Sequence, residues 1–278
     1  MQRKGMLKKL EHAPIDFDQL QNTQGKTVKR YNKQPQPFEI REQGSLRWIR
    51  FSDGSIQSVM LLQEPAYPML DYIQGLLCSL LYTQQPSSLL NLGLGAGSIE
   101  RFVLSQLPKI KLVSVEIDPN MVSFSRDYFN LPNSYPVVLS SAEHFLDTNQ
   151  KSYDIVVCDI YIKRNTENPL LTTSFYQDIA SILNQGGVLA INCLPASESE
   201  IVDLLLKIRS IFPWIAIFDV PSLQNVVLFC SLSAAPEIST LTTRAERLYQ
   251  SSGLNLLPIC KRLIWLPKSN QHRCGVEK

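Results

Sequence analysis

The stretch LLNLGLGAGSIERF, residues 89–102, decides the fold. It begins as a short apolar run, passes through GLGAG at 93–97, and continues as an amphipathic segment typical of a helix. Glycines between a strand and a helix let the backbone turn tightly and approach a ligand closely. The stretch therefore predicts a buried strand, a ligand-binding turn at Gly93, Gly95 and Gly97, and a helix.

The same alternation of strand and helix continues to the end of the central region. Apolar runs predict strands at 111–117, 135–140, 153–159 and 188–194, each followed by a segment with helical periodicity. Two β-rich runs, WIAIFDV and NVVLFCS, then lie close together around Pro221 and predict an antiparallel hairpin. The pattern predicts an α/β protein with a class I methyltransferase-like Rossmann fold, in which a mostly parallel sheet ends in an antiparallel hairpin.

The chain before this region reads differently. Residues 38–62 alternate apolar and polar side chains around an Asp53-Gly54 turn, which predicts a small antiparallel sheet. We divide the chain into segments as follows: a polar basic arm at 1–36, a small N-terminal β-domain at 37–67, a Rossmann-like domain at 68–235, and a C-terminal helix and tail at 236–278. The arm is expected to be solvated and flexible.

Composition excludes several classes of protein. Apolar residues make up 44% of the 278 residues and charged residues 19%, which rules out a mainly disordered chain. The net charge of +2, from 27 basic and 25 acidic residues, gives no general reason to expect a nucleic acid or an acidic membrane surface as partner. Six scattered cysteines and three histidines form no metal-binding spacing, so no metal is expected. No signal peptide is evident, and we expect a cytoplasmic protein that does not associate with membranes.

An acidic residue at the end of the next strand points to a nucleoside. Glu116 lies 19 residues after Gly97, where a carboxylate can accept hydrogen bonds from ribose hydroxyls. A dinucleotide-binding turn would have glycine at position 98, where this chain has Ser98. Together with the terminal hairpin, this difference favours an adenosyl sulfonium over NAD.

Asp159 ends the fourth predicted strand and is expected to face the same crevice. Freeing the lone pair of an alkyl amine with a pKa near 10.4 costs roughly 4–5 kcal/mol at neutral pH. A nearby carboxylate can orient the ammonium and accept its proton. The alternative is that Asp159 is merely solvated or caps a helix. Cys158, next to it, is expected to pack on the opposite side of the strand.

These motifs, in this order, resemble the polyamine aminopropyltransferase (spermidine synthase) family. The resemblance covers about residues 45–235 and is carried by DGSIQS at 53–58, the glycine stretch, VEIDPNMV at 115–122 and YDIVVCDIY at 153–161. It implies a small β-domain joined to a Rossmann-like domain, and transfer of an aminopropyl group from decarboxylated S-adenosylmethionine to a diamine. Because family members are commonly oligomers, a homodimer is expected.

The resemblance also implies roles for individual residues. Glu116 would hold the ribose, Gln57 would touch the nucleoside, and Asp159 would be the catalytic acid or base. A tyrosine of the amine site would fall on Tyr67 or Tyr72, and the spacing to Gly93 favours Tyr72.

Three departures from the family pattern remove acidic groups. The family's glycine loop carries an Asp where this chain has Ala96, the acid that usually contacts adenine falls on Ser141, and a second Asp of the fourth-strand motif is replaced by Ile162. A buried ammonium without a partner costs several kcal/mol, so recognition of ordinary diamines is in doubt. An Asp at position 96 would repel the carboxylate of intact S-adenosylmethionine, whereas Ala96 would not. We therefore expect better tolerance of intact S-adenosylmethionine than in a typical member.

Three functions follow from these observations. The first is a spermidine synthase-like transferase that uses decarboxylated S-adenosylmethionine or S-adenosylmethionine as co-substrate and a small-molecule amine as acceptor. The second is a methyltransferase on the same fold. Because DIYI at 159–162 lacks the N/D-P-P-Y pattern of amino methyltransferases, its acceptor is unspecified. The third is a catalytically degenerate nucleoside-binding protein.

Overall fold

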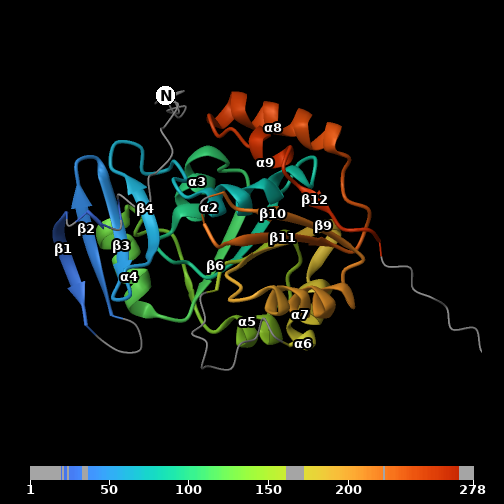
Figure 1. The fold of residues 1–278 in the computed structure, drawn as a ribbon, viewed down its shortest axis with the longest axis horizontal. Helices are drawn as coiled ribbons and strands as arrows, with labels where there is room; N and C mark the ends of the chain where they lie inside the picture. Colours follow the sequence, from blue (N-terminus) through green and yellow to red (C-terminus); the bar gives the residue numbers. More distant parts are fainter. Residues whose placement is uncertain are drawn as a thin grey trace, which may run out of the picture.

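The computed structural model describes residues 20, 22–23, 25–32, 37–160, 172–221 and 223–268. The N-terminal part of this chain forms a four-stranded antiparallel sheet, drawn in blue in Figure 1. Its strands, in spatial and sequence order, are β1 (Lys26–Tyr31), β2 (Phe38–Gln43), β3 (Leu46–Phe51) and β4 (Ile56–Leu61). Strands β2 to β4 confirm the predicted small antiparallel sheet.

Strand β1 corrects the expectation that residues 26–31 belong to a solvated arm. Its basic side chains face acidic ones of β2, and Arg30 forms an ion pair with Glu39 at 2.7 Å. The Tyr31 ring packs against Phe38 with 5.0 Å between centroids. Ion pairing and one aromatic contact therefore stabilise β1, although the composition of this segment is polar. Most of the predicted arm, and the chain beyond residue 268, lie outside the described residues.

The second sheet contains eight strands in the order β12-β10-β11-β9-β8-β5-β6-β7. The bounds of these strands are β5 (Ser88–Leu92), β6 (Lys111–Glu116), β7 (Val138–Leu139), β8 (Tyr153–Cys158), β9 (Leu183–Cys193), β10 (Trp214–Asp219), β11 (Val226–Ser231) and β12 (Ile264–Trp265). Neighbours from β9 to β7 run parallel, whereas β11, β10 and β12 add antiparallel pairs. The predicted parallel sheet with a terminal hairpin, β10 and β11, is confirmed.

Helices cover both faces of this sheet (Figure 1). One face carries α2 (Asp71–Leu77), the 3-10 turn η1 (Cys78–Leu81), α3 (Ser98–Gln106), α8 (Ile238–Ser252) and α9 (Leu257–Cys260). The other face carries α5 (Ala142–Thr148), α6 (Thr173–Ser181) and α7 (Glu198–Arg209). Each face has its own buried core, which is why the central strands read as continuous apolar runs. None of the described helices combines the length and apolarity that crossing a bilayer requires.

The small sheet is joined to the large domain through an apolar cluster. Helix α4 (Pro119–Phe129) begins where Asp118 accepts a hydrogen bond from the Asn120 amide at 2.8 Å. Its aromatic face packs against β2, β3 and β4, and Ala96 of the glycine turn is buried in the same contact. The cluster contains Phe38, Ile40, Ile49, Phe51, Met60, Ala96, Phe124 and Phe129. The small sheet therefore forms a wall beside the glycine turn.

The order of the strands determines where a ligand can bind. After β5 the chain adds β6 and β7 on one side, and then returns to add β8 and β9 on the other. The loops that leave β5 and β8 consequently diverge at the carboxyl ends of two adjacent parallel strands, which is the usual ligand site of such sheets. These loops contain the glycine turn and Asp159.

Phe129→Ala tests whether the small sheet is packed on α4. Phe129 is fully buried, so truncation should lower the free energy of unfolding by about 3–5 kcal/mol, as measured by urea denaturation. Leu206→Ala, at a side chain that is 66% exposed on α7, serves as control and should change it by less than about 0.5 kcal/mol. Equal effects of the two substitutions would contradict the packing described here.

Candidate active site

The glycine turn has a backbone that only glycine adopts easily. Gly93, Gly95 and Gly97 all have positive φ, at 97°, 53° and 74°. A β-carbon at Gly93 would collide with the backbone carbonyl of Asp159, and one at Gly95 would lie 2.8 Å from Nε2 of Gln57. The glycines therefore allow the turn to approach β8 on one side and β4 on the other. Gly97 is the N-terminal cap of α3.

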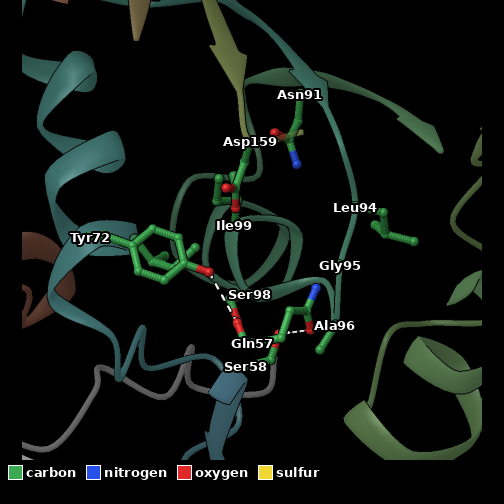
Figure 2. Close-up of a pocket in the computed structure, with 11 residues that line it drawn as sticks. Gln57, Ser58, Tyr72, Asn91, Leu94, Gly95, Ala96, Ser98, Ile99 and Asp159 are labelled. Carbon is green, nitrogen blue, oxygen red and sulfur yellow. Dashed lines mark hydrogen bonds between the residues drawn. The ribbon is translucent and has the colours of Figure 1, made fainter. Parts of the chain in front are cut away.

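A pocket lies beneath this turn, where the large sheet meets β4 and α2. It encloses about 250 Å³, including space open to solvent. Figure 2 shows side chains from three regions converging on it. Its lining consists of Gln57, Ser58, Tyr72, Ile73, Asn91, Leu94, Gly95, Ala96, Ser98, Ile99 and Asp159. Asp159 is the one residue in that lining with a formal charge at neutral pH.

Asp159 is held in the pocket by a chain of two amides. Its Oδ1 accepts a hydrogen bond from Nδ2 of Asn192 at 2.8 Å, and Oδ1 of Asn192 accepts one from Nδ2 of Asn225 at 2.9 Å. Burial raises the pKa of Asp159 to about 6, the Asn192 bond opposes this rise, and the nearby Glu116 adds to it. A carboxyl group with a pKa near neutrality can both accept and release a proton under physiological conditions.

Tyr72 reaches the pocket from α2. Its hydroxyl donates to the backbone oxygen of Gln57 at 3.1 Å, which ties α2 to β4 (Figure 2). Burial, and secondarily Asp159, raise the pKa of Tyr72 well above its ordinary value, so the phenol stays protonated. Of the two tyrosines considered from sequence, the structure places Tyr72 in the pocket lining, and Tyr67 is not part of that lining.

Arg101 fixes the turn from behind. The guanidinium is buried and donates to the carbonyl oxygens of Ala96 and Pro65, the latter at 2.6 Å, and to the Ser98 hydroxyl at 3.2 Å. Burial lowers the pKa of Arg101 to about 10, so the side chain still carries its charge at neutral pH. The contacts join the glycine turn to the segment that follows β4.

A second polar network lies under the turn. Oε1 of Glu100 accepts hydrogen bonds from Nδ2 of Asn91 and from the Ser114 hydroxyl, both at 2.6 Å. The Ser114 hydroxyl also bonds Tyr135 at 2.8 Å. Because the amide nitrogen of Asn91 is occupied by Glu100, its carbonyl oxygen is left toward the pocket, buried and without a hydrogen-bond partner. Burial raises the pKa of Glu100.

The two remaining predicted residues, Glu116 and Ser141, lie outside the pocket lining, and Glu116 contacts the turn. Oε2 of Glu116 accepts a hydrogen bond from the Leu94 amide at 3.0 Å, and Oε1 accepts one from the Asp118 amide at 2.9 Å. Burial raises the pKa of Glu116 despite these bonds. The Ser141 hydroxyl caps α5 by accepting from the His144 amide at 3.2 Å. Their nucleoside contacts stay predictions, and Ile162 lies outside the described residues.

Sequence reasoning missed the two asparagines that contact the key carboxylates. Asn91 and Asn192 each interrupt an otherwise apolar strand, SLLNL and VLAINC. A buried polar residue requires a partner, so an amide in such a run is a signal that could have been used. Arg101, which reads as part of an amphipathic helix, gave no such signal. Among the described residues, no three His, Cys, Asp or Glu side chains cluster in a way that could hold a metal ion.

Gly93→Ala should lower the free energy of unfolding by more than the strain of a positive φ alone accounts for. Gly186→Ala is the matched control, because Gly186 has φ of 75° but open space around a new β-carbon. The control should lose about 1–2 kcal/mol of unfolding free energy from backbone strain. Gly93→Ala should lose at least about 1 kcal/mol more by urea denaturation, since the methyl group meets the Asp159 carbonyl. Equal losses would contradict the close approach of the two strand ends.

Asp159 should make stability depend on pH in a defined window. Because its pKa is raised from 3.8 to about 6, the folded state binds this proton more tightly than the unfolded chain. The resulting stabilisation is complete below about pH 4 and is lost as the pH rises through about 6. Its size is at most about 3 kcal/mol, and less to the extent that solvent reaches the carboxylate.

Asp159→Asn removes this titration. Relative to the unchanged protein, the variant should therefore gain unfolding free energy between pH 4 and pH 7 in urea titrations. A difference between the two proteins that stays constant across this range would show that the pKa of Asp159 is not raised.

Comparison with known proteins identifies the family of this chain. The sequence profile of the spermine/spermidine synthase domain matches residues 78–240, more than half of the chain. A polyamine aminopropyltransferase of Chromobacterium violaceum is 25% identical over 244 residues, which cover 85% of this chain and 92% of that protein.

Solved structures agree on the fold. A probable spermidine synthase from Corynebacterium glutamicum superposes with a TM-score of 0.67 at 18% identity, covering 86% of this chain and 90% of that one. Human methyltransferase-like protein 13, solved in complex with SAH, superposes with a TM-score of 0.59 at 21% identity, covering 74% and 97%. The predicted methyltransferase-like Rossmann fold is confirmed, and the chain belongs to the spermine/spermidine synthase domain family.

Proposed function

We propose that this spermidine synthase-like transferase moves an alkyl group from an adenosyl sulfonium to an amine, with Asp159 as the group that orients and deprotonates the amine. The observation that supports it best is the placement of Asp159 at the point where β5 and β8 diverge, held by Asn192 and with a pKa raised to about 6. The family supports the class of reaction.

The proposed reaction requires the protein mainly to align the amine with the carbon attached to the sulfonium. The amine nitrogen forms a bond to a carbon attached to the sulfonium, the carbon–sulfur bond breaks, and its electron pair stays on sulfur as a neutral thioether. The nitrogen gives up one proton, for which Asp159 is the acceptor. Positioning two reactants in line contributes a large part of such an acceleration, and general base catalysis adds about 10²–10⁴-fold.

The pocket fits these requirements. Tyr72 stays protonated and is anchored to Gln57, so it contributes a fixed wall and a dipole rather than a charge. Asp159 has one oxygen committed to Asn192 and the other available to an amine. Glu116 and Ser141 remain our candidates for ribose and adenine contacts, and Gly93, Gly95 and Gly97 for close backbone approach to the nucleoside.

The group transferred is the point on which two functions differ. Transfer of an aminopropyl group from decarboxylated S-adenosylmethionine agrees with the family and with the aminopropyltransferase relative. Methyl transfer from S-adenosylmethionine is the second candidate, favoured by the likeness to a methyltransferase-like protein solved with SAH and by Ala96 in the glycine turn. The thioether product distinguishes them, because the first releases methylthioadenosine and the second S-adenosylhomocysteine.

The acceptor and the cellular form of the protein complete the proposal. The acceptor is a small-molecule amine, because one carboxylate in a small pocket suits one ammonium group. A cytoplasmic homodimer stays our prediction for the cellular form.

Asp159→Asn tests the assignment of the base. The substitution keeps the shape and removes the proton acceptor, so kcat should fall about 10²–10⁴-fold in an assay that quantifies thioether product with a panel of amines. Asp203→Asn, at an exposed position of α7, is the matched control and should leave kcat unchanged. Product formation that survives Asp159→Asn undiminished would refute the role of Asp159, and the absence of either thioether from the unchanged protein would favour the degenerate binding protein.

A further inference from the structure

One end of the pocket offers hydrogen-bond donors. Oε1 of Gln57 accepts from the Ser58 hydroxyl at 2.6 Å, which fixes the amide so that Nε2 lies against Gly95. Within the described chain, no residue accepts a hydrogen bond from that nitrogen. The Ser98 hydroxyl accepts from Arg101 at 3.2 Å, so its own hydrogen is free to donate into the pocket it lines.

Positive potential lies behind these donors. Ser98 is the first residue of α3, whose first turn has no side-chain cap, and the buried guanidinium of Arg101 lies just behind it. The acid on the same turn is Glu100, which is not part of the pocket lining: Asn91 and Ser114 hold its Oε1, its Oε2 is buried without a hydrogen-bond partner, and burial raises its pKa. This end of the pocket therefore suits an anion.

The other end offers acceptors. Oδ1 of Asn91 is buried without a hydrogen-bond partner in a residue that is only 1% exposed. Asn91 of β5 and Asp159, at the end of the neighbouring strand β8, both line the pocket and are drawn at the top of Figure 2, whereas Gln57 and Ser98 are drawn below them. An unpartnered buried carbonyl oxygen beside a carboxylate suits a cation that carries N–H donors.

We infer that this pocket binds an α-amino-acid group, and hence the methionine end of an S-adenosyl sulfonium that has kept its carboxylate. The ammonium lies at the unpartnered oxygen of Asn91, and the carboxylate lies at Gln57 and Ser98, so that Asp159 stays available to the acceptor amine. The inference rests on the proposed function, because it takes an adenosyl sulfonium as the donor.

Charge favours the intact donor over the decarboxylated one. Decarboxylated S-adenosylmethionine brings two positive charges and no anion to a pocket whose lining carries one formal charge, that of Asp159, while the buried guanidinium of Arg101 lies behind Ser98. Intact S-adenosylmethionine brings a carboxylate that the donors at Gln57 and Ser98 can bind.

Calorimetric titration of the full chain with three ligands tests this inference. S-adenosylmethionine should bind at least about tenfold more tightly than decarboxylated S-adenosylmethionine, because a hydrogen-bonded carboxylate is present only in the first. Methylthioadenosine, which lacks the amino-acid end, reports on the nucleoside site alone. If it binds while the decarboxylated donor matches or exceeds the intact one, this inference fails and the proposed function stands. If none of the three binds, both fail.

Gln57→Glu locates the carboxylate. The change keeps the side-chain shape but replaces the donor nitrogen with an anionic oxygen, so affinity for S-adenosylmethionine should fall at least about tenfold. Affinity for methylthioadenosine, which has no carboxylate to repel, should fall less, even though Gln57 is also our candidate for a nucleoside contact. Gln63→Glu adds the same charge at an exposed position outside the pocket and should leave all affinities unchanged. A loss of the same size for all three ligands in Gln57→Glu would overturn the placement of the carboxylate.

Discussion

The contact between the ends of β5 and β8 is the constraint on which the site depends. The Asp159 amide donates to the Leu92 carbonyl at 2.8 Å, and the backbone of Gly93 leaves no room for a side chain against the Asp159 carbonyl. This approach places the proposed base directly beside the turn that is expected to receive the donor. Because a parallel sheet places both strand ends at one edge, the fold itself supplies the alignment that the proposed reaction needs.

Around this contact, polar networks substitute for a dense cluster of acids. Asn192 and Asn225 orient Asp159, Glu100 orients Asn91, and Arg101 supports the turn. These networks orient the side chains, and they leave Oδ1 of Asn91 and Oε2 of Glu100 buried without a hydrogen-bond partner. The pocket lining therefore carries one negative charge, that of Asp159, with the buried guanidinium of Arg101 behind Ser98, which bears on which donor the pocket binds.

The fold could be predicted from the sequence because the patterns that indicate it involve residues close together in the chain. Strand and helix periodicities, the glycine turn and the terminal hairpin are each set by neighbouring residues, and all are confirmed. Strand β1 was missed because its stability comes from pairing with β2 and from the Tyr31–Phe38 contact, neither visible from composition. In the site, Asp159 was predicted from its place at a strand end and Tyr72 through the family resemblance, and both line the pocket, whereas their roles stay predictions. The orientations of the Asn91 and Arg101 side chains could not be predicted from the sequence, since they depend on contacts between segments that are distant in sequence.

The central claim is that the glycine turn and Asp159 face the same donor. A crystal structure of the protein with bound methylthioadenosine tests this most directly. The account predicts that the thioether sulfur lies over the pocket mouth, between the glycine turn and the Asp159 carboxylate, with the ribose hydroxyls at Glu116. A nucleoside bound elsewhere on the molecule, or with its sulfur turned away from Asp159, would contradict it.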